Sequence, residues 1–193
     1  PYIASDAGIN GNAIIGPLDG TADHFTAGVA SDWSFLHEGT GMTIVMVFRT
    51  AALGTLRRLF DNNNGSGTAL GVTMQISAAS PALAWLNMGN GSAAVLSAPT
   101  AASITANSVN YLVFRHATAN TPDFSFNLNG VTTTGNNSNT PGTGAAAATL
   151  NIGRRSGAVQ YFNGDIAEFI TYERAISDAE QTQITDYITA RYL

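Results

Sequence analysis

One stretch near the end of the chain decides the fold: Tyr161-Phe162-Asn163-Gly164-Asp165-Ile166-Ala167-Glu168-Phe169-Ile170-Thr171-Tyr172. Its Asn-Gly pair predicts a turn, because both residues adopt a positive φ at low cost. Residues 166–172 are rich in β-branched and aromatic side chains and predict a strand. Strict alternation gives one face Ile166, Glu168, Ile170 and Tyr172, and the other Ala167, Phe169 and Thr171. Both faces are mostly apolar and should be covered, so Glu168 must accept hydrogen bonds or lie near an edge.

The segment after this strand predicts a capped α-helix from Asp178 to about Tyr192. Ser177 stands at the N-cap position, and Glu180 follows three residues later, which is the capping-box spacing. Asp178 adds negative charge to the first turn, where the helix dipole favours it. An amphipathic stripe then recurs at steps of three and four residues, formed by Ile184, Tyr187, Ile188, Arg191 and Tyr192.

The strand and helix together resemble the closing segment of laminin-G-like and pentraxin-like domains of the concanavalin A-like superfamily. The family pattern is roughly Phe-x-Gly-x-Ile-x-Glu-hydrophobic, then Tyr-x-Arg-Ala-Leu-Ser-x-x-Glu. Here it reads Phe162, Gly164, Ile166, Glu168, Phe169, Tyr172, Arg174, Ala175, Ile176, Ser177 and Glu180. The resemblance implies an antiparallel β-sandwich of jelly-roll type with one C-terminal α-helix. Within it we expect structural roles for Gly164, Glu168, Ser177 and Glu180. The long helix is similar to that of bacterial and bacteriophage members.

Weaker matches extend the resemblance over most of the chain from Leu18 onward. Residues 42–49 are apolar on both faces and predict a central strand covered on both sides. Residues 72–76 and 83–88 alternate, which predicts half-exposed strands, with Trp85 and Asn87 on one face. We therefore expect a single domain over residues 1–193, with a lead-in segment at 1–12 and the helix at 178–192.

The composition limits the classes of partner. A net charge of −5, with eight Arg and no Lys, argues against nucleic acid as the main partner. The chain has no Cys, which excludes disulfides and thiolate metal sites. No segment is long and apolar enough to predict membrane insertion. Only 11% of the residues are charged, so the surface is expected to consist largely of small polar residues and Ala.

The acidic residues offer no recognisable catalytic pair. Glycoside hydrolysis needs two carboxyl groups about 5 to 10 Å apart, and the one acidic cluster is Asp165, Glu168 and Glu173. Positions an odd number apart face opposite sides of a regular strand, so neither Asp165 and Glu168 nor Glu168 and Glu173 form a pair, unless a bulge intervenes. Three histidines lack the company of a Ser-His-Asp triad and are expected at the surface or hydrogen-bonded: His24, His37 and His116. The sequence favours a protein that is not an enzyme.

Two acidic turns are candidates for a metal site. The segment from Asp19-Gly20 to His24 is explained by a turn. The loop at 61–67 places Asp61 and Asn63 at a spacing used by calcium ligands, but no acidic residue stands at its far end as an EF-hand requires. We therefore predict no cofactor, and keep Asp61 and Asn63 as weak candidates for calcium.

Two classes of function remain open. The first is a structural or assembly module, for decoration or adhesion, that contacts other protein chains as a homo-oligomer, in a virion such as a bacteriophage capsid, or on a bacterial surface. The weakly charged polar surface favours it, because such a surface is buried without stranding many charges. The second is carbohydrate binding, for recognition of host or environmental glycans. Its candidate residues are Trp85, Asn87, Asn90, Arg154, Arg155 and Tyr161, each of which also has a purely structural explanation. Both classes imply an extracellular or virion-surface location.

Overall fold

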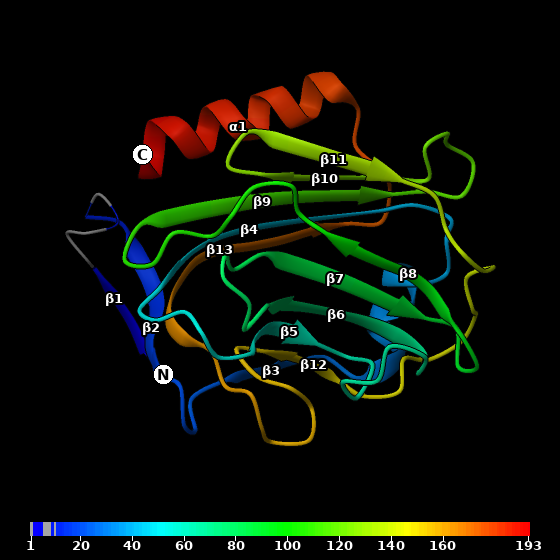
Figure 1. Cartoon of the computed structure of the whole chain (residues 1–193), viewed down its shortest axis with the longest axis horizontal. Coiled ribbons are helices and arrows are strands. Elements are labelled where there is room, and N and C mark those ends of the chain that lie inside the picture. The colour runs from blue at the N-terminus through cyan, green and yellow to red at the C-terminus, as the bar shows by residue number, and fades with distance from the viewer. Residues whose placement is uncertain (1, 6–8, 10) are drawn as a thin grey trace.

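The computed structural model describes residues 2–5, 9 and 11–193, whose strands form two packed antiparallel sheets (Figure 1). The seven-stranded sheet has the order β1 (Tyr2–Ser5), β2 (Ala13–Asp19), β13 (Asn163–Tyr172), β4 (Met42–Thr50), β9 (Val109–His116), β10 (Phe124–Leu128) and β11 (Val131–Gly135). The six-stranded sheet has the order β3 (Phe25–Ala27), β12 (Leu150–Ile152), β5 (Arg57–Asp61), β6 (Gly71–Ile76), β7 (Ala84–Gly89) and β8 (Ala94–Pro99). A 3-10 segment, η2 (Ala30–Leu36), follows β3. The predicted β-sandwich is confirmed.

The main core lies between the two sheets. Its largest side chains are fully buried aromatics, namely Phe48, Phe60, Phe114, Phe126 and Phe162. Strand β4 contributes to both sides of its sheet, because Met46 and Phe48 point into this core while Val45 and Val47 point to the outer face. The prediction of a central strand covered on both sides is therefore confirmed.

Helix α1 (Asp178–Tyr192) covers the outer face of the seven-stranded sheet (Figure 1). Ile188 and Tyr192 are buried in a second apolar cluster with Val45 and Val47 of β4. The capping box is present: the amide of Glu180 donates to Ser177 Oγ at 3.3 Å, and the amide of Ser177 donates to Glu180 Oε2 at 2.8 Å. The predicted helix is confirmed, cap included.

The predicted alternation on β13 is wrong at Ile166. The register against β4 shifts between Ile166 and Glu168, which marks a β-bulge at Ala167. Ile166 therefore points into the main core, whereas Ala167 lies on the side of the helix, together with Glu168. Glu168, Ile170 and Tyr172 do share a face, because the regular alternation resumes after the bulge.

The first residues do more than lead into the sandwich. Residues Tyr2–Ser5 form β1, which pairs antiparallel with β2 from Tyr2 opposite Gly16 to Ser5 opposite Ala13. The sequence predicted only a lead-in over residues 1–12, because four residues are too few to show a period of two. The rest of that segment, residues 1, 6–8 and 10, lies outside the described residues.

Candidate functional site

The outer face of the six-stranded sheet carries one polar side chain on each strand, all at one level. The ladder registers place side by side Thr26, Asn151, Asp61, Thr73, Asn87 and Ser97. Their chain neighbours, including Phe60, Leu86 and Ile152, belong to the main core. Because successive side chains alternate between the faces of a strand, this polar row lies on the face turned away from the core.

The half of this face over β6, β7 and β8 is partly open: Ser97 is exposed and Asn87 is half-buried, whereas Thr73 is buried. Trp85 lies beside Gln75 of β6, and both side chains are half-buried. Ser97 Oγ donates a hydrogen bond of 2.7 Å to Asn87 Oδ1. Among the described residues, the amide nitrogen of Asn87 and the side chain of Gln75 have no hydrogen-bond partner, so they are available to a ligand. The prediction that Trp85 and Asn87 share a face is confirmed.

The other half of the face is closed by the loop 153–162. The Ser156 amide donates to Asp61 Oδ2 at 2.9 Å, and the Ser156 hydroxyl bonds the same oxygen. Arg58 Nε donates to Gln160 Oε1 at 3.0 Å. Arg58 and Asp61 are consequently buried, and this burial lowers the pKa of Arg58. The loop thus forms a wall beside the open half of the face.

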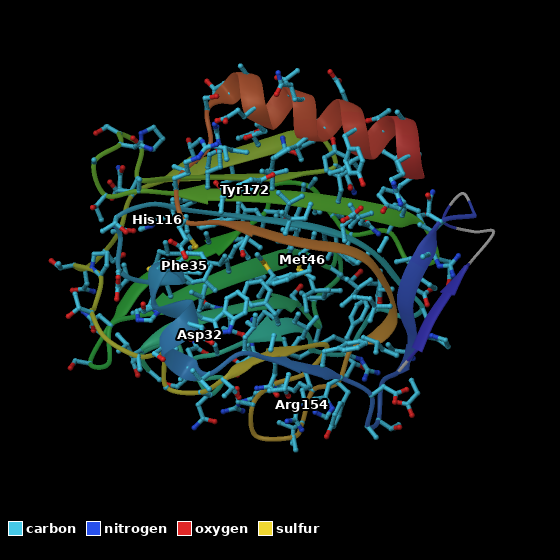
Figure 2. The ribbon with its side chains drawn as sticks, turned by 180° about the vertical axis from the view of Figure 1, so that it is seen from behind. Asp32, Phe35, Met46, His116, Arg154 and Tyr172 are labelled. Atoms are coloured by element: carbon cyan, nitrogen blue, oxygen red, sulfur yellow. The ribbon has the colours of Figure 1, made fainter. Side chains whose placement is uncertain are left out.

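Arg154 lies on this wall and shares the polar face. Its Nε donates to Asn151 Oδ1 at 3.0 Å (Figure 2 labels Arg154 on its loop). Asn151 on β12 stands three strands from Asn87 on β7, about 14 Å at the usual strand spacing. Among the described residues, no carboxylate pairs with Arg154.

The remaining candidates for glycan binding have structural contacts. Arg155 donates through Nε and a terminal nitrogen to the Asn64 carbonyl, at 3.3 and 3.1 Å, and so joins two loops. Tyr161 packs edge-on against His24, with ring centroids 6.3 Å apart. Asn90 closes its own turn, since its Oδ1 accepts from the amides of Ser92 and Ala93. The structure therefore brings Trp85 and Asn87 together and places Arg154 farther along the same face.

The oxygens of Asp61 and Asn63 are engaged by the protein itself. The Gly65 amide donates to Asp61 Oδ1 and to Asn63 Oδ1, at 3.0 Å each. Among the described residues, no three His, Cys, Asp or Glu side chains gather as metal ligands would. In the earlier turn, the hydroxyl of Thr21 and nearby backbone amides bond Asp19 and hold the pKa of its carboxyl well below the usual range. Both loops are thus explained as hydrogen-bonded turns.

The bulge at Ala167 also changes which carboxylates share a face of β13. Asp165 lies opposite Arg49 and Glu168 opposite Val47, so the two acids share a face, contrary to the expectation from strict alternation. Both acids have structural partners. Arg49 forms an ion pair with Asp165 at 2.7 Å. Glu168 Oε1 accepts hydrogen bonds of 2.6 Å from the hydroxyls of Tyr187 and Tyr192. This agrees with the expectation that a carboxylate on a covered strand accepts hydrogen bonds.

The histidines are hydrogen-bonded, as the sequence predicted. His24 Nδ1 lies 3.0 Å from the Ala22 carbonyl, His37 Nε2 lies 3.0 Å from the Gly144 carbonyl, and His116 Nε2 lies 2.9 Å from Asn137 Oδ1. His37 and His116 are buried, which lowers the pKa of both imidazoles. Their contacts are those of structural residues.

Sequence reasoning missed five members of the polar face: Thr26, Thr73, Gln75, Ser97 and Asn151. Two of them could have been predicted from the sequence, because the alternation of residues 72–76 places Thr73 and Gln75 on the face away from the core. Their grouping with Trp85 and Asn151 depends on strand order, which periodicity does not contain.

The chain belongs to the concanavalin A-like lectin/glucanase superfamily, since the model of that family matches residues 19–180. No curated protein matches the sequence. Within the described residues, no helix has the length and apolar character needed to cross a bilayer.

Several solved structures share the fold. The CBM40 module of the Ruminococcus gnavus IT-sialidase, bound to α2,3 sialyllactose, superposes with a TM-score of 0.62 at 13% identity, over 84% of this chain and 96% of that one. A heptameric SAP-like pentraxin from Limulus polyphemus gives 0.59 at 12% identity, over 87% and 79%. The NanB sialidase of Streptococcus pneumoniae gives 0.62 at 17% identity, over 88% of this chain but 27% of that one. At these identities the likeness concerns the fold.

Proposed function

We propose that the chain is a carbohydrate-binding module whose site is the open half of the six-stranded sheet, over β6, β7 and β8. The observation that carries the proposal is the half-buried indole of Trp85, which stands among Gln75, Asn87 and Ser97 on one polar face. Similarity to a CBM40 module bound to sialyllactose supports this function. The proposal places glycan recognition ahead of assembly, the reverse of the order favoured by the sequence.

The chemistry of this face suits a sugar. The indole offers a flat apolar surface to the C–H face of a pyranose ring. The Asn87 and Gln75 amides both donate and accept, and therefore match hydroxyl groups in either role. Arg154 bonds Asn151, whose strand lies about 14 Å from that of Asn87, and its guanidinium group would bond an acidic substituent there. We therefore propose an oligosaccharide, with an acidic residue at the Arg154 end, as the class of ligand.

Calorimetric titration with α2,3-sialyllactose, α2,6-sialyllactose and lactose tests this function. We expect Trp85→Ala to abolish measurable binding, and Asn87→Ala to weaken it about tenfold, as for the loss of one or two hydrogen bonds. Arg154→Gln should remove the preference for the sialylated sugars. Thr134→Ala, on β11 of the other sheet, is the matched control. Unchanged affinity in the Trp85 variant, or no binding across a panel of neutral and acidic glycans, would contradict the proposal.

Contact with other protein chains is the second candidate function. It is supported by the low proportion of charged residues and by the fold shared with a heptameric pentraxin. Both proposed functions are compatible with an extracellular location. Both are also compatible with a place in a virion or on a bacterial surface. Light scattering at high protein concentration checks self-association directly. Imaging of the native source particle would reveal whether the domain occurs in symmetric copies.

A further inference from the structure

Strand β11 forms one edge of the seven-stranded sheet and pairs with β10 alone. A two-residue turn with positive φ at both positions joins the two strands. A turn of this kind makes the flanking pair, Leu128 and Val131, a hydrogen-bonded pair. In an antiparallel ladder, alternate residues turn their N–H and C=O groups away from the paired strand. The backbone groups of Thr132 and Thr134 therefore point away from the sheet.

These outward groups have no partner within the chain. Among the described residues, no hydrogen bond reaches the backbone N–H or C=O of Thr132 or Thr134. Both residues and Val131 are exposed. Helix α1 packs its buried side chains on β4 and β9, which lie farther into the sheet. Each copy of the chain thus presents two free donors and two free acceptors along this edge.

Strand β11 lacks the features that normally protect an edge strand. Such strands commonly carry a charge, a proline or a bulge that prevents pairing with another chain. Residues 131–135, all of which the structure describes, read Val-Thr-Thr-Thr-Gly, and their ladder with β10 has no register shift. The edge strand of the other sheet differs, because the chain after β11 covers the start of β8. There the Ser138 amide donates to the Val95 carbonyl at 2.7 Å.

A second copy of β11 matches this edge in one symmetric register. When two β11 strands run antiparallel with Thr133 opposite its own copy, Thr132 lies opposite Thr134 on both sides of the two-fold axis. Each of these two pairs exchanges two backbone bonds. Four bonds then use every outward group of both copies. At the ends of the paired segment, Val131 lies opposite Gly135, which has no side chain to obstruct it.

The side chains are complementary in the same register. It forms three Thr–Thr pairs, which are favourable across antiparallel strands, and it places no like charges opposite each other. A two-fold axis perpendicular to the sheet keeps the inner faces of both copies on one side. The two seven-stranded sheets would therefore join into one continuous sheet, with the two sandwiches side by side.

We propose that two copies of the chain associate through β11, with Thr133 beside the two-fold axis. The partner is a second copy because one symmetric register satisfies every outward backbone group of both strands. This inference rests on the protein-contact function and gives it a specific surface. It is independent of glycan binding, because the glycan site lies on the six-stranded sheet.

Disulfide cross-linking tests the register, because the chain has no Cys of its own. In Thr133→Cys the two thiols belong to a non-hydrogen-bonded pair, whose Cα atoms lie about 4.5 Å apart, within reach of a disulfide. We expect mild oxidation to give a covalent dimer. Val131→Cys is the matched control: the side chain of Val131 is 47% exposed, but its two copies would lie about 13 Å apart along the strands. Equal or faster cross-linking of Val131→Cys would overturn the proposed register.

Sedimentation equilibrium at high protein concentration tests the edge without a disulfide. Thr134→Pro removes an outward N–H and no bond to β10, and edge strands tolerate proline at such positions. Its dimer dissociation constant should rise at least about tenfold, because two of the four bonds are lost. Thr134→Val keeps the N–H and should associate like the wild type. A melting curve checks that Thr134→Pro is folded.

Three outcomes would overturn the proposal. The first is a wild type that stays monomeric, and the second is assembly beyond a dimer. The third is self-association that Thr134→Pro leaves unchanged, which would retain the protein-contact function but exclude β11 as its surface. Trp85→Ala should associate like the wild type, which separates this surface from the glycan site.

Discussion

At the scale of single residues, Glu168 shows how one side chain joins a helix to a sheet. It projects from β13 toward α1, and one carboxylate oxygen accepts hydrogen bonds from Tyr187 and Tyr192. Tyr187 is 43% exposed, whereas Tyr192 is 4% exposed and has little access to water. Burial, together with the bond to Glu168, raises the pKa of Tyr192. The phenol therefore stays protonated and keeps donating over the ordinary pH range.

Replacement of Glu168 should accordingly destabilise the protein. We expect Glu168→Ala to lower the free energy of unfolding by about 1–3 kcal/mol, because the buried hydroxyl of Tyr192 loses its acceptor. Urea denaturation followed by fluorescence measures the change. Glu173→Ala, an exposed acid at the end of the same strand, is the control and should leave the midpoint unchanged. Equal midpoints for both variants would show that the two phenols do not depend on this carboxylate.

At the scale of secondary structure, the N-terminus of α1 combines three interactions in one turn. Ser177 and Glu180 form the reciprocal capping box, and Arg174 donates to both carboxylate oxygens of Glu180, at 2.8 and 2.6 Å. The bonds from Arg174, and then those from Ser177, lower the pKa of Glu180 to about 2. The start of the helix is thus stabilised by a charged group as well as by a cap.

The N-cap and the buried face of α1 should contribute differently to the free energy of unfolding. Ser177→Ala is expected to cost about 0.5–2 kcal/mol, because it leaves a first-turn amide without its acceptor. Ile188→Asp is expected to cost more, at least about 3 kcal/mol, since it removes a buried side chain and places a charge in the contact with β4. Thermal unfolding by circular dichroism measures both. If both variants melted like the wild type, α1 would not contribute to the stability of the sandwich.

The ion pair at the helix start predicts a pH dependence of stability. The pKa of Glu180 is lower in the folded state, so its contribution is complete above the unfolded value of about 4.5 and is lost as the pH falls toward 2. The stability of the wild type should therefore decline over this range more than that of Glu180→Gln, which has no charge to lose. Chemical denaturation between pH 7 and pH 2 measures the difference. Parallel curves for the two proteins would exclude this carboxylate as a source of the decline.

At the scale of the whole molecule, the two sheets have different outer faces. The seven-stranded sheet is covered by α1 over an apolar cluster that includes Val45, Val47 and Ile188. The six-stranded sheet exposes a polar face with a wall formed by the loop 153–162. The outer faces of the two sheets therefore differ in chemistry: one is apolar and covered by a helix, and the other is polar.

We predict that the protein needs no metal ion to fold. We expect EDTA to leave the melting temperature unchanged, and added calcium not to raise it, because backbone amides already bond Asp61 and Asn63. A calorimetric scan with and without each reagent measures this. A clear rise in the melting temperature with calcium would show that the loop at 61–65 is a cation site.

We also expect no turnover of polysaccharides, which a reducing-sugar assay checks.

Much of the local structure follows from the sequence alone. The α1 cap could be predicted because Ser177 and Glu180 interact within one turn of chain. The strand at 42–49 and the face shared by Trp85 and Asn87 follow from side-chain periodicity, which is also a local property. The family pattern around Phe162 and Glu168 then indicated how these elements combine into a sandwich. The fold was therefore largely predictable.

The tertiary structure alone decided the rest. The bulge at Ala167 moves Ile166 into the core and brings Asp165 and Glu168 to one face, since pairing with β4 fixes the register. The polar row from Asn151 to Asn87 depends on the order β12, β5, β6 and β7, which joins residues far apart in the chain. Strand β2 pairs with β13 only as far as Ile166, whereas β4 pairs with it as far as Tyr172. Sequence periodicity determines which face a side chain occupies, because it is a local property. The pairing of distant strands determines which side chains lie next to it, and the polar face consists of such neighbours.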